Sequence, residues 1–266
     1  MRNLVVLIAL VFVSCSGQKE NKQEESSQSS DVAEQVNPII KSIQEAHNVE
    51  AFMQEKIISF DIKLIFGGNE RLDARIYSTT NSSKVLVENS ESTRLLFDGN
   101  DIWIHPKDSL YDGARFDALT WSYFFMAPFK LNDPGTHHTE PKKLPYQEND
   151  SLMTTKLTFG ENIGDAPDDW YVVYQNEESK VLEAMAYIVT FGGRDQAKAA
   201  QNPHAISYSD YTKVEGVPFA QQWKFWNWSE EDGLEDQLGE ATISNIQFLD
   251  DASVFDKREG AVKVNE

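Results

Sequence analysis

The chain has 266 residues, of which 24 are lysine or arginine and 43 are aspartate or glutamate, so its formal net charge is −19. This acidity argues against nucleic acid and against an anionic membrane surface as partners, because both require a basic patch. The single cysteine excludes an internal disulfide and any zinc or iron–sulfur site built from several cysteines. A hydrophobic content of 40% is ample for a packed core.

That cysteine, Cys15, ends a segment typical of a bacterial lipoprotein signal peptide. Arg2 supplies the positive start, and Leu4 to Val13 is an uninterrupted apolar run. The run is too short to span a bilayer, which takes about 20 residues. The preceding Phe-Val-Ser resembles a lipobox, with Phe in place of the usual Leu. We therefore expect removal of residues 1–14 and attachment of a diacylglycerol anchor and palmitate at Cys15. The alternative is an ordinary signal peptide with an incidental cysteine.

The next residues indicate a tether. From Ser16 to Asp31 the chain contains no hydrophobic residue, so residues 15–31 cannot bury apolar surface and are predicted to be disordered. A serine follows the cysteine, which in lipoprotein sorting favours the outer membrane. We expect a monomer anchored there by its acyl chains, with no preference for either side. Residues 32–266 contain no further linker and predict a single domain.

The domain is predicted to begin with a helix. Asp31 is placed to N-cap it, and the apolar residues have the helical spacing. These residues are Val32, Val36, Ile39, Ile40 and Ile43. Pro38 lies within this pattern, so the regular helix either begins near it or kinks there. Alternation then predicts a strand from Ile58 to Phe66 and, after a Gly-Gly-Asn turn, a second strand around Leu72, Ala74 and Ile76.

Strands continue at short intervals to the end of the chain. We predict them at 84–88, 93–97, 102–105, 152–159, 170–175, 181–191, 205–211, 219–228 and 240–248. The exception is Asp112 to Met126, whose apolar residues favour a helix that ends at Ala127-Pro128. Consecutive antiparallel strands with few helices predict a mainly β fold, a curved sheet that forms an incomplete half-barrel closed by helices.

Two of these strands are apolar on both faces. In 219–228, Trp223 and Phe225 face one way while Trp226 and Trp228 face the other. The strand at 181–191 has the same character. A solvated antiparallel sheet has one polar face, so both faces must be covered here. Helices are expected to cover one face, and the other to line an interior, a partner surface or a ligand cavity.

Several motifs carry a family resemblance. The hairpin LLFDGNDIWIHPKDS, with Asp98, Gly99, Trp103 and Pro106, resembles a hairpin of the LolA-like and LolB-like lipoprotein carrier and sorting proteins. WYVVYQNEESKVLEAMAYIVTFGG and YTKVEGVPFAQQWKFWNW are similar to their later strands. Through YFFMAPFKLNDPG and GDAPDDWYVVY the chain looks closer still to a bacterial lipoprotein family with a domain of unknown function, from about residue 32 onward.

The resemblance implies a half-barrel whose concave apolar face is closed by helices, the place where LolA-like carriers hold acyl chains. Those carriers are soluble, whereas this chain has an expected anchor, so it looks more like the anchored receptor side or like neither. An apolar ligand suits such a cavity because removing each CH₂ from water is worth about 0.8 kcal/mol. The candidate cavity-lining residues are Trp103, Trp121, Phe125, Phe129, Trp223 and Phe225. Packing in the core is the alternative for each of them.

A metal site is the less favoured interpretation of the acidic loop at Asp165, Asp168 and Asp169. Such loops bind Ca²⁺ in some proteins, but the spacing is not that of an EF-hand, and a solvated loop is the favoured alternative. His137 and His138 are adjacent, so on a strand they point to opposite faces. We expect no cofactor, and no catalytic motif is present.

These features leave three functions open. The leading hypothesis is a non-enzymatic, lipid-anchored outer-membrane lipoprotein that binds an apolar ligand, acyl chain or partner. The second is a lipid-anchored hydrolase that acts on glycans through loop carboxylates, which are recognised by their separation in three dimensions. The third is a structural or interaction lipoprotein whose interior is filled by its own side chains.

Overall fold

The computed structural model describes residues 36–148, 150–161 and 163–264. The expected signal peptide (1–14), the acylation site Cys15, the tether (15–31) and the N-cap Asp31 lie outside these residues. Residues from Val36 onward form one unit.

The first helix begins at the proline. Of the two predicted alternatives, a helix start near Pro38 is the one observed, since Val36 and Asn37 are not helical. The Asn37 side chain accepts hydrogen bonds from the backbone N–H groups of Ile39 and Ile40, and proline fits the first helical turn because its missing N–H needs no partner there.

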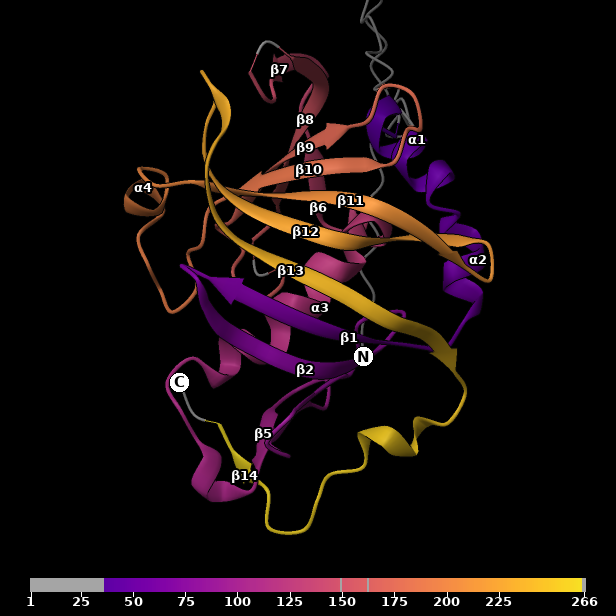
Figure 1. Cartoon of the computed structure of the whole chain (residues 1–266), viewed down its shortest axis with the longest axis vertical. Helices are drawn as coiled ribbons and strands as arrows, with labels where there is room; N and C mark the ends of the chain where they lie inside the picture. The colour runs from indigo at the N-terminus through magenta and orange to yellow at the C-terminus, as the bar shows by residue number, and fades with distance from the viewer. Residues whose placement is uncertain (1–35, 149, 162, 265–266) are drawn as a thin grey trace, which may run out of the picture. The chain divides into compact units, whose positions relative to one another are not determined.

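The elements follow one another in the order drawn in Figure 1. The helices are α1 (Pro38–Ala46), α2 (Val49–Gln54), α3 (Ala114–Lys130) and α4 (Gln196–Ala199), with 3₁₀ turns η1 (Lys107–Ser109) and η2 (Ala252–Phe255). The first strands are β1 (Ile57–Phe66), β2 (Asn69–Thr79), β3 (Val85–Asn89), β4 (Arg94–Phe97) and β5 (Ile102–His105). After α3 come β6 (Thr136–His138), β7 (Lys142–Pro145), β8 (Ser151–Phe159), β9 (Trp170–Gln175) and β10 (Leu182–Tyr187). The last are β11 (His204–Val214), β12 (Val217–Ser229), β13 (Gly233–Leu249) and β14 (Val262–Lys263).

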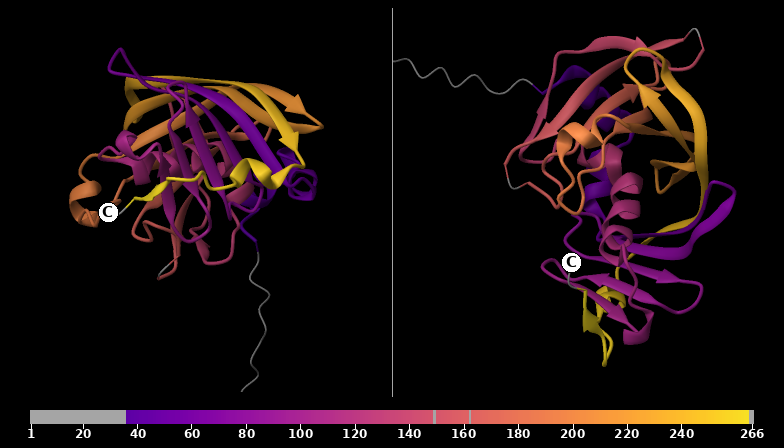
Figure 2. Two further views of the ribbon diagram at one scale, coloured as in Figure 1. Left: turned by 90° about the horizontal axis from the view of Figure 1, so that it is seen from below. Right: turned by 90° about the vertical axis from the view of Figure 1, so that its left-hand side faces the viewer.

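All strands of the described residues belong to one 14-stranded antiparallel sheet, in the order β14-β5-β4-β3-β2-β1-β13-β12-β11-β10-β9-β8-β6, with β7 also paired to β8. Two meanders are thus joined where β1 pairs with β13. The sheet curves strongly and stays open (Figures 1 and 2). The predicted mainly β fold with a curved, incomplete barrel is confirmed.

Helix α3 lies inside the curve of the sheet (Figure 2). It leads from β5, next to one end of the sheet, to β6 at the other end. Its side chains pack against strands far apart in sequence: the ring of Phe125 stacks on Phe60 at 3.8 Å and on Phe219 at 5.1 Å between centroids. The main hydrophobic core is therefore the space between α3 and the concave face.

The predicted end of this helix at Ala127-Pro128 is wrong, because α3 continues through Pro128 to Lys130. Proline has no N–H to donate to the carbonyl of Phe124 four residues earlier, which usually ends a helix. Here the Tyr208 hydroxyl, from β11, donates to that carbonyl at 3.1 Å. A tertiary hydrogen bond thus replaces the missing helical one.

Other boundaries also differ from the predictions. β13 begins at Gly233 instead of 240, and β10 ends at Tyr187 instead of 191. The short elements α2, α4, β6, β7 and β14 are absent from the predictions. Most of them pair or pack at the periphery of the sheet, where two to four residues carry too little pattern to predict a strand.

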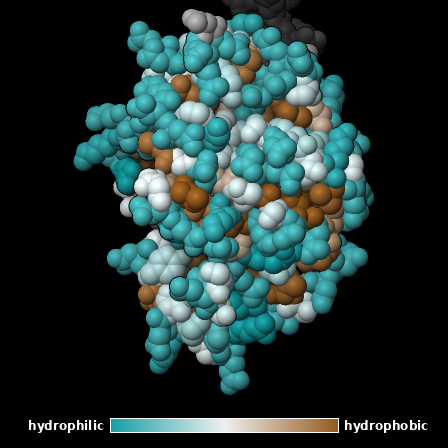
Figure 3. Space-filling view, in the orientation of Figure 1, coloured by the Kyte–Doolittle hydropathy of each residue, from teal (hydrophilic) through white to brown (hydrophobic). Residues whose placement is uncertain are grey.

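Local packing covers the convex face too. Ala184, Ala186 and Trp228 lie against Leu144 and Leu234, which come from β7 and the tip of the β12–β13 hairpin. Elsewhere the C-terminal segment places Phe255 over Leu86 and Leu96. Hydrophobic residues on this face therefore lie in small groups between hydrophilic ones (Figure 3). The second face of the doubly apolar strands is covered by hairpin ends, and the cavity described below lies on the α3 side.

The close contact of Gly233 with Tyr146 predicts a large loss of stability when this glycine is replaced. Gly233 has φ +77°, and a Cβ there would lie 2.6 Å from the carbonyl oxygen of Tyr146, which accepts a hydrogen bond from Leu234 N at 2.8 Å. Gly68 has the same φ of +77° but nothing within 4 Å. We expect Gly68→Ala to cost about 1–2 kcal/mol for the backbone strain alone, and Gly233→Ala at least about 3 kcal/mol because the hydrogen bond is also lost. Urea denaturation measures both, and equal losses would contradict the contact.

Candidate functional site

A cavity of about 840 Å³, partly open to solvent, lies between α3 and the concave face of the sheet. This volume is within the range of small-molecule sites. Most of its wall comes from α3 between Arg115 and Met126, and from the ends of strands on both sides of that helix. The strand residues include Phe66, Arg71, Val85, Phe97, Phe159, Tyr171, Tyr187, Phe225 and Leu238.

Aromatic rings form much of this wall. The indole of Trp121 meets Phe225 edge-on at 6.3 Å and Phe116 at 5.9 Å between centroids. On the other side, Tyr187 packs at 5.0 Å against Phe124. A wall of aromatic rings shields the apolar atoms of a ligand from water, so it suits a hydrocarbon chain.

A buried carboxylate orders the first turn of α3. Asp117 is 1% exposed and accepts four hydrogen bonds. Arg71 Nη2 donates to both of its oxygens, at 2.8 and 3.0 Å, the Tyr111 hydroxyl to one at 2.8 Å, and Trp121 Nε1 to the other at 3.0 Å. The charge of Asp117 is thereby paired, as a buried charge requires. Arg71 and Trp121, which both line the cavity, are held in position by it.

The loop after β8 forms a second polar part of the wall. Arg115 is hydrogen-bonded and ion-paired to Asp165, and Asp169 accepts from the Thr190 backbone N–H at 2.7 Å and from its hydroxyl at 2.8 Å. Burial raises the pKa of the Asp169 carboxyl, although the bonds from Thr190 oppose the shift. Both carboxylates are thus engaged with protein donors, which favours a structural role over a pair of catalytic acids.

Three tyrosines add hydroxyl groups that remain neutral. Tyr123, Tyr171 and Tyr187 line the cavity, and burial raises the pKa of each phenol well above its ordinary value. The rings of Tyr123 and Tyr171 lie 5.5 Å apart between centroids. The cavity therefore combines apolar rings with neutral hydroxyls along one side.

Of the six aromatic residues proposed from sequence, Trp121 and Phe225 line this cavity. Phe125 and Phe129 lie in the packed core, where Phe129 stacks on Phe52 at 3.8 Å. Trp223 is 1% exposed and meets Tyr208 edge-on at 5.9 Å, also in the core.

Trp103 lies apart from the other five. It packs with the Leu86, Leu96 and Phe255 cluster, its indole N–H donates to Asp98 at 2.7 Å, and Lys257 Nζ lies 3.6 Å from its ring centroid. It does not contribute to the cavity wall.

Sequence reasoning missed most of the wall. Leu119, Phe116 and Tyr123 are ordinary apolar residues of a helix, and only their position on the side of α3 that is left partly uncovered distinguishes them from core residues. Arg71 was missed as well. An arginine in the first positions of an otherwise alternating strand was the available signal for it.

The three carboxylates predicted as weak metal candidates do not form a cluster within the described residues. Asp165 and Asp169 are engaged as described, and the backbone carbonyl of Asp168 accepts from Gln196 Nε2 at 2.7 Å. No group of three histidine, cysteine, aspartate or glutamate side chains converges anywhere in the described residues. His138 Nε2 lies 2.8 Å from the Leu131 carbonyl oxygen, and no metal cluster includes it or His137 in that part of the chain.

Within the described residues, no helix is both long enough and apolar enough to cross a membrane. The chain belongs to DUF6503, a family of unknown function, whose model matches residues 82–250. The expected kinship with a bacterial family that carries a domain of unknown function is thereby confirmed. No curated protein matches the sequence.

Solved structures show the wider likeness. A LolA superfamily protein from Nitrosomonas europaea superposes with a TM-score of 0.50 at 12% identity, covering 82% of this chain and 96% of that one. A DUF1329 family protein from Desulfovibrio piger gives 0.49 at 13% identity, over 83% and 98%. A domain named for outer membrane lipoprotein sorting, from Vibrio parahaemolyticus, gives 0.49 at 11%, over 80% and 96%. The first of these likenesses confirms the LolA-like fold expected from the motifs.

Proposed function

We propose that this protein is a non-enzymatic lipoprotein that binds an apolar ligand or acyl chain in the cavity beside α3. The observation that carries the proposal is the partly open cavity of about 840 Å³ with its aromatic and aliphatic wall. Each CH₂ of a chain that enters it would contribute about 0.8 kcal/mol. The LolA-like fold supports a role of this type. The open space beside Trp121 also supports it, because an interior filled entirely by its own side chains would leave no such cavity.

The proposal includes attachment to the outer membrane through acyl chains at Cys15, with residues 15–31 as tether and 32–266 as the binding domain. The apolar run, the lipobox and the serine after the cysteine support it. A single acyl chain binds a membrane only marginally, whereas two or more anchor it stably. Removal of Arg2 with the signal peptide would leave a formal charge of about −20, so acyl chains and not charge would hold this acidic monomer to the membrane.

Filling the cavity tests the binding role. Leu119 lies on α3 and lines the cavity, so Leu119→Trp is expected to lower uptake of oleyl alcohol at least roughly tenfold, because the larger ring occupies the chain's space. Native mass spectrometry of the full chain, released from detergent micelles, counts the bound molecules.

The matched control is Met53→Trp, which adds the same ring to α2 at a side chain that is 46% exposed. It should leave uptake unchanged. Equal uptake by wild type and Leu119→Trp, or no uptake by the wild-type chain, would refute the proposed site.

A further inference from the structure

We propose that the cavity selects amphiphiles with an anionic headgroup, a carboxylate or a phosphate, and that Arg71 binds that headgroup. The inference rests on the proposed function and specifies its ligand. Its basis is the side chain of Arg71, which lines the cavity, is 42% exposed and uses one of its three nitrogens for Asp117.

The remaining donors of Arg71 are available to a ligand. Among the described residues, neither Nη1 nor Nε of Arg71 has a hydrogen-bond partner. A guanidinium presents its N–H groups as a planar fork that matches the paired oxygens of a carboxylate or phosphate. An anion beside Arg71 would therefore accept hydrogen bonds from the N–H groups that Asp117 does not use.

Asp117 prepares Arg71 for this role. It holds the guanidinium through both oxygens, and it is itself held by Tyr111 and Trp121. A side chain fixed in advance loses less freedom when a ligand binds. Since Trp121 also belongs to the apolar wall, the headgroup site and the chain site share one rigid corner at the first turns of α3.

The carboxylates of the cavity lie on the other side of the helix. Arg115 and Asp117 are two positions apart on α3, so they do not face the same way, and Arg115 pairs with Asp165 while Asp117 pairs with Arg71. The residues that line the cavity from β2, β3 and β4 and their turns include Arg71 and no acidic side chain. An anion bound at Arg71 thus avoids Asp165 and Asp169.

A cationic headgroup has the weaker case. It would have to use Asp165, both of whose oxygens already accept from Arg115, or Asp169, one of whose oxygens already accepts two hydrogen bonds from Thr190. Burial of Asp169, which raises its pKa, further weakens it as a counter-ion. For either headgroup, burial of the ligand's hydrocarbon chain would supply most of the affinity, and the contact with the headgroup would supply the selectivity.

The test compares four amphiphiles that share one oleyl or oleoyl chain: oleate, oleoyl lysophosphatidate, oleyl alcohol and oleylamine. The full chain is titrated with each, and native mass spectrometry from detergent micelles gives the bound fraction. We expect the two anions to bind roughly tenfold to a hundredfold better than the alcohol, the usual worth of a charge-assisted hydrogen bond. Which anion binds better distinguishes a fatty acid from a phospholipid as the source.

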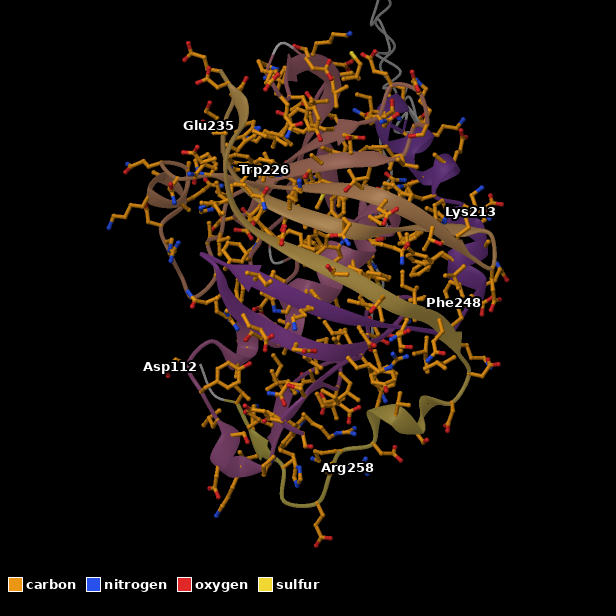
Figure 4. The ribbon with its side chains drawn as sticks, viewed as in Figure 1. Asp112, Lys213, Trp226, Glu235, Phe248 and Arg258 are labelled. Atoms are coloured by element: carbon orange, nitrogen blue, oxygen red, sulfur yellow. The ribbon has the colours of Figure 1, made fainter. Side chains whose placement is uncertain are left out.

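Arg71→Gln should abolish this preference, so that oleate and oleoyl lysophosphatidate bind no better than oleyl alcohol binds to the same variant. Because that variant leaves Asp117 buried without its cation, the double variant Arg71→Gln/Asp117→Asn removes both charges and should show the same loss. Arg258→Gln is the matched control, since Arg258 is exposed in the C-terminal segment, away from the cavity (Figure 4). Thermal melting verifies that each variant is folded.

The outcomes separate the two proposals. If the wild-type chain binds none of the four, the proposed function itself fails. If it binds the alcohol as well as the anions, prefers oleylamine, or keeps its anion preference in both Arg71 variants, the apolar site stands and the assignment of Arg71 is overturned.

Discussion

Acidification from pH 6.5 to pH 4 is expected to destabilise the fold by about 3 kcal/mol through His47 alone. This side chain is 1% exposed at the end of α1. Its Nε2 accepts a hydrogen bond from the Leu182 backbone N–H at 3.1 Å, so Nδ1 carries the proton and faces the Pro218 carbonyl oxygen at 3.3 Å. Burial lowers the pKa of the imidazole to about 4, against the opposing effect of the Pro218 carbonyl.

The sign follows from the two states. Between pH 6.5 and 4 the unfolded chain takes up a proton at His47 while the folded chain does not, so the free energy of unfolding falls as the pH falls. Urea denaturation at several pH values measures the slope. In His47→Gln this part of the slope should vanish, whereas His105→Gln, at a half-exposed site on β5, should retain it. Asp169 and His204 titrate in both chains and cancel in the comparison. Equal slopes in wild type and His47→Gln would contradict the prediction.

The second large effect concerns Phe125. Its replacement by alanine is expected to lower the free energy of unfolding by about 3–5 kcal/mol. Its ring is 5% exposed and lies between Phe60 and Phe219. Removing it opens a void in tightly packed surroundings that cannot collapse, because the helix and two strands meet there. Thermal or urea denaturation of the purified chain measures the loss.

Phe116→Ala is the matched comparison for Phe125→Ala. Phe116 belongs to the same helix but faces the existing cavity and is half-buried, so a smaller loss of about 1–2 kcal/mol is expected. A loss at Phe116 as large as that at Phe125 would mean that the cavity wall is packed as densely as the core. The pair thus separates core aromatics from cavity aromatics by a measurement of stability.

The repetitive part of the fold was predictable from the sequence. The alternation of apolar residues predicts β1 directly. In β12 the spacing of residues such as Trp223 and Trp226 shows that both faces of the strand are apolar. The curvature followed from the number of consecutive antiparallel strands. These features depend on local patterns, which every strand carries within itself.

The errors arose where a distant residue decides the local structure. The passage of α3 through Pro128 depends on Tyr208, 80 positions later. The first half of β13 is rich in polar residues and is a strand because β12 pairs with it.

The same limit applies to the site. Sequence showed which aromatic residues share a face, but it did not show that the space beside Trp121 is left open while the space beside Phe125 is filled. The place of Arg71 depends on a contact with α3, 46 positions away. The spacing of apolar residues shows which face of a strand or helix is apolar. Only the packing of α3 against the sheet decides where along it a cavity remains.

The open sheet has a consequence for how these molecules behave at high concentration. A sheet that does not close has two ends, and unpaired strand edges are templates for association with other chains. Here one end is β14, of two residues, and the other is β6, of three, beside the four residues of β7. Such brief edges offer another strand few backbone groups to pair with. The fold thus keeps an accessible interior without the long exposed strand that would promote aggregation.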